Sequence, residues 1–240
     1  MARSYQAFRF KQFNIQHNQS IFKVGTDGVL LGAWANIKKP ESILDIGCGS
    51  GLIAIMCGQR NAKASIIGLE IDTKSADEAK VNAANSPWAN RIKIINQSIQ
   101  DFAKSSIVKF DHIISNPPFF IDGTVSDNQT KAQTRHTQLL PFKDLVLACT
   151  KLLNPNGLVS FILPVEEAKI LTFLCEQKGL YLNRLCEVRP LLNKAIERWL
   201  MEFSLNQTTI KKTELVIQHL GRNNYTNAYK ALTGDFYLNM

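Results

Sequence analysis

Asp45-Ile46-Gly47-Cys48-Gly49-Ser50-Gly51 is the most informative run in this chain. The short apolar segment 42–46 predicts a buried strand, and residues 52–59 predict a helix directly after the loop. Glycine at every second position allows positive φ and lets a ligand approach the backbone closely. An acid before such a loop repels phosphate but suits an ammonium group or a water network. We therefore expect a cofactor-binding loop; the simpler alternative is a loop that only turns the chain.

Strands and helices alternate on the carboxyl side of this loop. Further strands are expected at 64–69, 92–96, 110–115, 157–163, 180–188 and 199–205, with helices at 74–84, 142–153 and 165–178. A last strand is expected at 214–220 within a small C-terminal extension, 206–240. The alternation predicts an α/β fold in which a seven-stranded, mostly parallel sheet carries helices on both faces. Ligands of such sheets bind at the carboxyl ends of the strands.

An acidic residue, Glu70, ends the second expected strand. At that place a carboxylate can accept hydrogen bonds from both hydroxyls of a ribose. The alternatives are a solvent-facing strand end, or Asp72 in the same role.

The fourth expected strand ends in Ser115-Asn116-Pro117-Pro118-Phe119. Two prolines cannot continue a central strand because they lack N–H donors, so they fix a rigid turn. The proline after Asn116 favours an extended backbone for that residue. The Asn116 side-chain oxygen and the Pro117 carbonyl offer two acceptors for one NH₂ group, and Phe119 offers a flat face to a planar substrate. The alternative is a Pro-Pro loop with a buried phenylalanine.

Composition limits the classes of protein. The chain has 240 residues, 45% of them apolar, and a net charge of +8. Residues 1–40 carry six Lys/Arg and one acid, residues 41–178 are neutral, and residues 179–240 carry eight bases and five acids. Basic ends around a neutral centre suit a polyanion, or merely solubility. No apolar run reaches membrane-spanning length. Five cysteines without a CxxC pair argue against a zinc site or a disulfide framework and favour the reducing cytoplasm.

Together the glycine loop and Glu70 resemble the class I S-adenosylmethionine-dependent methyltransferases. The resemblance implies that the loop holds the amino-acid end of the cofactor and that the acid holds its ribose. Family members often place an aspartate for the adenine amine where this chain has Ser98, so that contact is open to a hydroxyl or a backbone amide. The cofactor residues it implies are Lys23, Thr26, Asp45, Gly47, Gly49, Gly51, Glu70, Ile71, Ser98, Ile99 and Asn116.

The Asn116 tetrapeptide is similar to the (N/D)PP(Y/F) motif of methyltransferases that act on planar nitrogens. The resemblance implies catalytic roles for Asn116, Pro117 and Phe119. An aromatic amine is a poor nucleophile because its lone pair is conjugated with the ring. Two acceptors that take hydrogen bonds from both of its N–H groups favour a pyramidal nitrogen whose lone pair points at the methyl group. Such chemistry needs no metal and no dedicated base.

Residues 22–34, which begin Phe22-Lys23-Val24-Gly25-Thr26-Asp27-Gly28, predict a loop and then a helix capped by Thr26 or Asp27. They closely resemble the stretch before the glycine loop in bacterial tRNA(Val) adenine-37 N6-methyltransferases. The resemblance, which runs from about Phe10 to the C-terminus, implies one methyltransferase domain over 1–240 whose basic segment 1–40 covers the cofactor site. It also implies substrate contacts from Pro118, Phe120 and Arg135, the last within the polar stretch 122–138, which is expected to be a lid, an RNA-binding arm or an ordinary surface loop.

Two other functions stay open. A glutamine N5-methyltransferase of release factors shares the proline turn, but it normally carries a sizeable helical domain before the glycine loop. Only 44 basic-leaning residues precede Asp45 here. A non-catalytic RNA-binding module would have no need for the two acceptors at Asn116 and Pro117. The oligomeric state does not follow from the sequence.

Overall fold

Eight strands form one sheet in the computed structural model, which describes residues 7–17, 23–118, 141–221 and 223–239. In chain order they are β3 (Ser42–Ile46), β4 (Ser65–Glu70), β5 (Ile92–Asn96), β6 (Phe110–Ser115), β7 (Leu153–Pro164), β8 (Tyr181–Leu191), β9 (Arg198–Ser204) and β10 (Lys211–Gln218). Their order across the sheet is β10-β8-β9-β7-β6-β3-β4-β5. Neighbouring strands are parallel, except that β9 is antiparallel to both β7 and β8. The mostly parallel sheet is confirmed, and the count of seven is wrong because the last expected strand, 214–220, joins the same sheet as the edge strand β10 beside β8.

The centre of the sheet contains the point where the strand order reverses. The chain enters at β3, adds β4 and β5 on one side, and then returns to the other side of β3 with β6 and β7. Loops that leave β3 and β6 therefore diverge, and they leave a crevice at the carboxyl ends of these two strands. The glycine loop follows β3, and Asn116 follows β6.

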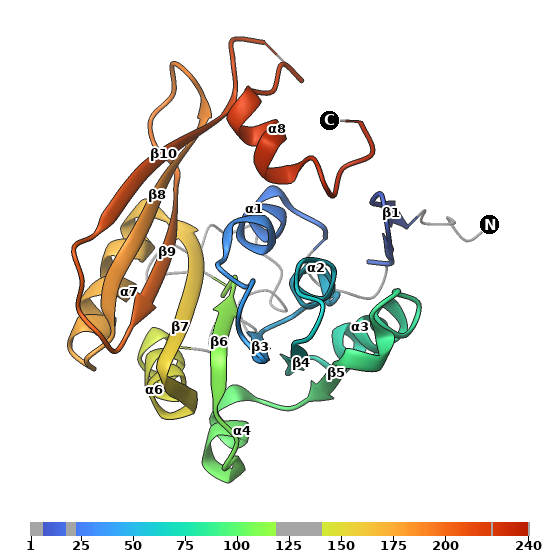
Figure 1. Cartoon of the computed structure of the whole chain (residues 1–240), viewed down its shortest axis with the longest axis vertical. Helices are drawn as coiled ribbons and strands as arrows, with labels where there is room; N and C mark the ends of the chain where they lie inside the picture. The colour runs from blue at the N-terminus through green and yellow to red at the C-terminus, as the bar shows by residue number, and fades with distance from the viewer. Residues whose placement is uncertain (1–6, 18–22, 119–140, 222, 240) are drawn as a thin grey trace, which may run out of the picture.

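Helices cover both faces of the sheet, as Figure 1 shows. One apolar core contains side chains from α1 (Thr26–Trp34), α2 (Leu52–Arg60), α3 (Thr73–Ala84) and α8 (Asn227–Thr233). A second core on the other face contains side chains from α4 (Ile99–Ser105), α6 (Phe142–Leu152) and α7 (Val165–Glu176). Alternation along β3 explains the two layers, since Ile43 packs in the first core and Leu44 in the second.

Several local expectations differ from the structure. Gly25, rather than Thr26 or Asp27, is the N-cap of α1, and Thr26 is its first helical residue. Residues 154–156, between the expected helix and the expected strand, belong to an irregular start of β7, where Asn154 donates to Asp111 over 2.7 Å. Two short helices, α4 and α8, and the 3₁₀ turn η1 (Ala89–Arg91) were not predicted. They are too short to show a clear helical period.

The two ends of the described chain meet. A small hairpin, β1 (Phe8–Arg9) with β2 (Asn14–Ile15), lies beside the segment that follows α8 (Figure 1). Phe10 forms a bridge with Tyr237, and the Lys11 amide donates to the Phe236 carbonyl over 2.7 Å. No local pattern in the sequence indicates this pairing.

A polar cluster fixes the C-terminal end of α1 on the sheet. Arg184 of β8 pairs with the buried Glu202 of β9 over 3.0 Å and lies 3.6 Å above the ring of Trp34. The Arg184 guanidinium also donates to the Trp34 carbonyl, and Glu202 accepts from the Asn36 amide. Glu202 is buried while the Arg184 side chain is 29% exposed, so these backbone partners offset part of the cost of burying the carboxylate; the Arg184 Nε has no partner among the described residues.

Candidate active site

The glycine loop contains three glycines with positive φ, which are Gly47, Gly49 and Gly51. Gly47 and Gly49 have φ of 70° and 53°, a region that other residues rarely adopt. An added Cβ at either position would meet no described atom within 4 Å, so both face open space. The amides of Gly47 and Cys48 both donate to the Leu69 carbonyl, each over 2.9 Å, which holds the loop against β4. A ligand can therefore approach this backbone closely.

Glu70 is fixed in place by backbone amides. One carboxylate oxygen accepts from the Gly49 amide over 2.8 Å, and the other accepts from the Asp72 amide over 2.9 Å. Each oxygen retains a second acceptor site. A half-buried carboxylate oriented from two sides is suited to bind a pair of neighbouring hydroxyls, such as those of a ribose.

Asp45 lies beneath the loop and is fully buried. Its Oδ2 accepts from the Ala54 amide of α2 over 3.0 Å, and its Oδ1 has no partner among the described residues. Burial raises the pKa of the Asp45 carboxyl to about 7, the Ala54 hydrogen bond opposes the rise, and the charge of Glu70 adds to it. An unpaired, buried carboxylate oxygen favours a nearby cation.

Asn116 follows β6 across the crevice. Ser115 donates to the Ile46 carbonyl over 2.7 Å, so the ends of β6 and β3 are tied directly below the site. The side-chain oxygen of Asn116 is buried and has no hydrogen-bond partner among the described residues. Buried polar atoms are normally paired, so this acceptor is available to a ligand. Phe119, Phe120, Arg135 and the stretch 122–138 lie outside the described residues.

A cavity of about 610 Å³ joins these features. Most of the residues predicted to hold cofactor or substrate line it, and they are Lys23, Thr26, Gly47, Gly49, Glu70, Ile71, Ser98, Ile99, Asn116, Pro117 and Pro118. Two predicted cofactor residues, Asp45 and Gly51, are not among the described residues of its wall. Asp45 is fully buried on β3, and Gly51 is the N-cap of α2.

Ser98 has a structural task that the sequence did not reveal. It is the N-cap of α4, and its hydroxyl accepts from the Asp101 amide and donates to the Asp101 carboxylate over 2.8 Å. This favours the backbone amides of residues 98–99 over the hydroxyl as contacts for an adenine ring.

Sequence reasoning missed the part of the wall that comes from β8, β9 and the loop between them. Val188, Pro190, Glu197 and Arg198 line the cavity, and Arg198 pairs with Asp27 of α1 over 2.9 Å. No local signal marks these residues, because they reach the site only when β9 inserts between β7 and β8. Within the described residues, His, Cys, Asp and Glu form no group of three that could hold a metal ion.

The strand order, the glycine loop, Glu70 and Asn116 define a class I S-adenosylmethionine-dependent methyltransferase. Residues 22–141 match the family model described as the methyltransferase small domain. The chain is 43% identical over 233 residues to the tRNA1(Val) (adenine(37)-N6)-methyltransferase of Pseudoalteromonas translucida (strain TAC 125), covering 97% of this chain and 99% of the relative. It is 39% identical over 235 residues to the protein of the same name in Vibrio vulnificus (strain YJ016), covering 98% and 97%. The chain belongs to this methyltransferase family.

Solved structures show the same fold. A predicted O-methyltransferase from Agrobacterium tumefaciens aligns with a TM-score of 0.70 at 16% identity, covering 88% of this chain and 96% of that one. A ribosomal protein L11 methylase from Lactobacillus delbrueckii subsp. bulgaricus aligns with a TM-score of 0.55 at 18% identity, covering 79% and 83%. Within the described residues, no helix is long and apolar enough to cross a membrane.

Proposed function

We propose that this protein transfers the methyl group of S-adenosylmethionine to N6 of adenine 37 in a valine tRNA, and that it acts in the cytoplasm. The observation that carries the chemistry is the buried, unpaired side-chain oxygen of Asn116, which belongs to the same cavity as Gly49 and Glu70. The substrate follows from relatives that bear the name tRNA1(Val) (adenine(37)-N6)-methyltransferase over nearly their full length.

The residues of the cavity fit the cofactor. When bound, S-adenosylmethionine supplies an electrophilic methyl group. Gly47 and Gly49 leave room along the backbone, and Glu70 retains acceptor sites for two hydroxyls. Three carboxylates (Asp27, Glu70 and Glu197) and two cations (Lys23 and Arg198) line the wall, an acidic balance that suits a positively charged ligand.

The substrate amine is positioned by the turn after β6. The Asn116 oxygen and the Pro117 carbonyl accept hydrogen bonds from its two N–H groups. This geometry removes the nitrogen lone pair from conjugation with the ring and directs it into the cavity. Because Pro117 and Pro118 fix the backbone, these acceptors are already oriented before the amine arrives. Phe119 stacks on the base, and Phe120 and Arg135 contact the RNA.

The whole chain acts as one domain. Its residues 1–40 cover the cofactor site, which accords with Lys23 and Thr26 lining the cavity. Residues 206–240 form a C-terminal extension, whose strand β10 lengthens the sheet.

The decisive experiment incubates the purified protein with radiolabelled S-adenosylmethionine and, separately, bulk tRNA, genomic DNA and a release factor. Label in tRNA, recovered as N6-methyladenosine by nucleoside mass analysis, is expected. Asn116→Ala serves as the inactive control. Label in the release factor alone would support glutamine methylation instead, and absence of label from all three would support a non-catalytic RNA-binding protein.

A further inference from the structure

A second cavity, of about 690 Å³, lies beside the first. The two share the wall formed by residues 24–26, Pro190 and Ile217. The remaining wall of the second cavity comes mostly from the two ends of the described chain, and it consists of Phe8, Arg9, Leu191, Gln218, Tyr225, Tyr229, Tyr237, Leu238 and Asn239. The second cavity is thus adjacent to the site that holds the proposed target amine, across this shared wall.

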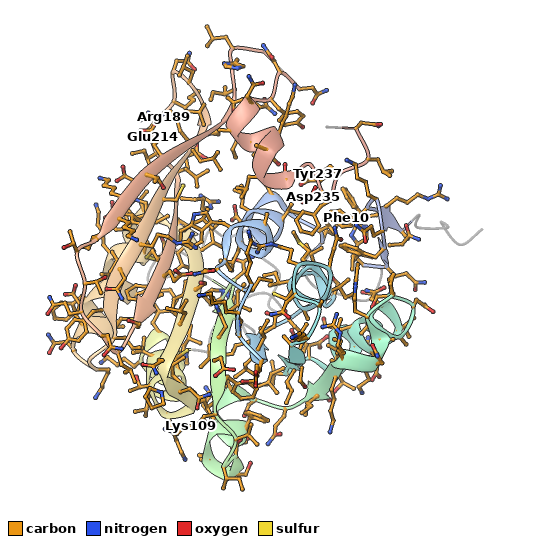
Figure 2. All side chains as sticks on the ribbon, viewed as in Figure 1. Phe10, Lys109, Arg189, Glu214, Asp235 and Tyr237 are labelled. Atoms are coloured by element: carbon orange, nitrogen blue, oxygen red, sulfur yellow. The ribbon has the colours of Figure 1, made fainter. Side chains whose placement is uncertain are left out.

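Backbone contacts fix the walls of this second cavity. The Lys11 side chain donates to the Gly234 carbonyl over 2.6 Å, which adds to the Phe10–Tyr237 bridge. Phe10 and Tyr237 lie close together in Figure 2, to the right of the centre and well away from Lys109. On the other side, the Thr226 amide donates to the Ile217 carbonyl over 3.0 Å and anchors the start of α8 to β10.

Four aromatic side chains line the second cavity in two pairs. Tyr225 stacks on Tyr229 with ring centroids 5.2 Å apart, and Phe8 meets Tyr237 edge-on at 6.3 Å. Tyr229 is 2% exposed and forms a hydrogen bond with the Tyr237 side chain, so it joins the two pairs. Tyr225 is only partly buried, which leaves part of its surface for a ligand.

The two cavities differ in the charge of the residues that line them. The first has three carboxylates in its wall, whereas the described residues around the second include no acid and one cation, the exposed Arg9. Rigid aromatic faces beside a cation and without carboxylates are the features that bind single-stranded nucleotides, by stacking the base and neutralising the phosphate.

We propose that the second cavity holds the base of a nucleotide next to the target adenine, stacked against Tyr225, with Arg9 at its phosphate. The inference rests on the proposed function, because RNA must first present an adenine amine to Asn116. An anticodon loop is single-stranded, so its bases can be separated from one another and bound individually. The shared wall at 24–26 and Pro190 separates the target adenine from its neighbour. This site would orient the loop as well as bind it.

The test measures steady-state methylation of the valine tRNA by the full-length protein and three variants. Tyr225→Ala is expected to raise the KM for tRNA roughly 5- to 140-fold, as loss of one base–aromatic stack predicts, and to leave the KM for S-adenosylmethionine unchanged. Tyr225→Phe keeps the flat face and should match the wild type. Phe173→Ala is the matched control, since Phe173 is 61% exposed on α7 and lines neither cavity.

A double-mutant cycle identifies the bound base. Anticodon stem–loops carrying an abasic nucleotide at position 36 or at position 38 replace the tRNA. With one of the two RNAs, Tyr225→Ala should no longer raise the KM for RNA, because that RNA lacks the base that stacks on Tyr225. If Tyr225→Ala raises the KM by the same factor with both abasic RNAs as with the intact RNA, Tyr225 acts on the fold and the inference is wrong.

If the Tyr225→Ala protein fails to fold, the Arg9→Ala variant tests the proposed nucleotide site instead. Arg9 is exposed on a two-residue strand, and its loss should weaken tRNA binding and lower the slope of log affinity against log salt by about 1. Lys109→Ala, which lines neither cavity, is the control. An unchanged salt slope with Arg9→Ala would overturn the inference while leaving the proposed function intact. A wild-type protein that forms no N6-methyladenosine would overturn both.

Discussion

The Glu70 carboxylate accepts a hydrogen bond from the Gly49 amide over 2.8 Å, so the acid at the end of β4 directly holds the glycine loop that follows β3. The two motifs are separated in sequence by a helix and a strand, and they form one structure at the crevice. Glu70 therefore has two tasks, which are to fix the loop and to present acceptors to a ligand.

Glu70→Ala should weaken S-adenosylmethionine binding by about tenfold or more. It removes charge-assisted hydrogen bonds that contribute roughly 1.5–3 kcal/mol, and it frees the Gly49 amide. Calorimetric titration measures the affinity. Asp77→Ala, which removes an exposed carboxylate from α3, should bind the cofactor normally. Unchanged affinity in a folded Glu70→Ala protein would exclude Glu70 from the site.

Cofactor affinity should rise with pH up to about 7. Burial raises the pKa of Asp45 to about 7, so below that pH the carboxyl is protonated and neutral in the free protein. A cationic ligand in the adjacent cavity favours the ionised form, so binding below pH 7 must release a proton and should weaken by up to about tenfold per pH unit. Titrations between pH 5.5 and 8.5 in buffers of different ionisation enthalpy measure the affinity and the released proton. Asp45→Asn should abolish this pH dependence; the same slope in that variant would show that another group titrates.

Asn116→Ala should stop turnover while leaving both ligands bound. One preorganised acceptor for the amine is lost, and such a loss lowers the rate on the order of 10²–10³-fold. Single-turnover methylation with saturating tRNA and cofactor isolates the chemical step, and Asn90→Ala, an exposed position in η1, is the control. A near wild-type rate for Asn116→Ala would make Asn116 only a structural turn residue.

Binding of tRNA should fall steeply as salt rises, because Lys and Arg release condensed counterions from the phosphates. The double substitution Lys211→Glu with Lys230→Glu should reduce that dependence and weaken tRNA binding without changing cofactor affinity. Lys109→Glu, just before β6 in the part of the chain without net charge, is the charge-reversal control. Filter binding at several salt concentrations measures both quantities, and an affinity insensitive to salt would mean that the basic ends serve solubility alone.

Glu202→Ala should lower the free energy of unfolding by about 3 kcal/mol, because it leaves the Arg184 guanidinium and the Asn36 amide without their carboxylate. Urea denaturation measures the change. Glu166→Ala removes an exposed carboxylate that pairs with Lys169, and it should change stability by less than about 1 kcal/mol. A loss of similar size in both variants would show that the cluster under α1 does not stabilise the fold.

Local sequence was sufficient for the elements that line the centre of the crevice. Alternating glycines can adopt positive φ at Gly47 and Gly49, and apolar runs of strand length must be buried on both faces, so β3, β4, β5 and β6 were predictable to within a residue or two. The Asn116-Pro117-Pro118 turn was predictable for the same reason, since proline restricts the backbone whatever surrounds it.

The remaining parts of the fold and of the site depend on pairing between segments that are distant in sequence. The place of β9 between β7 and β8, the addition of β10, and the bridge from Phe10 to Tyr237 depend on which distant segments bury each other best. These pairings bring Glu197 and Arg198 to the first cavity and Phe8 and Tyr225 to the second. Periodicity and turn chemistry act over a few residues, and they specify which face of an element is buried but not its partner. The residues that form the cofactor loop were therefore visible in the sequence, whereas those that enclose the site emerged only from the folded chain.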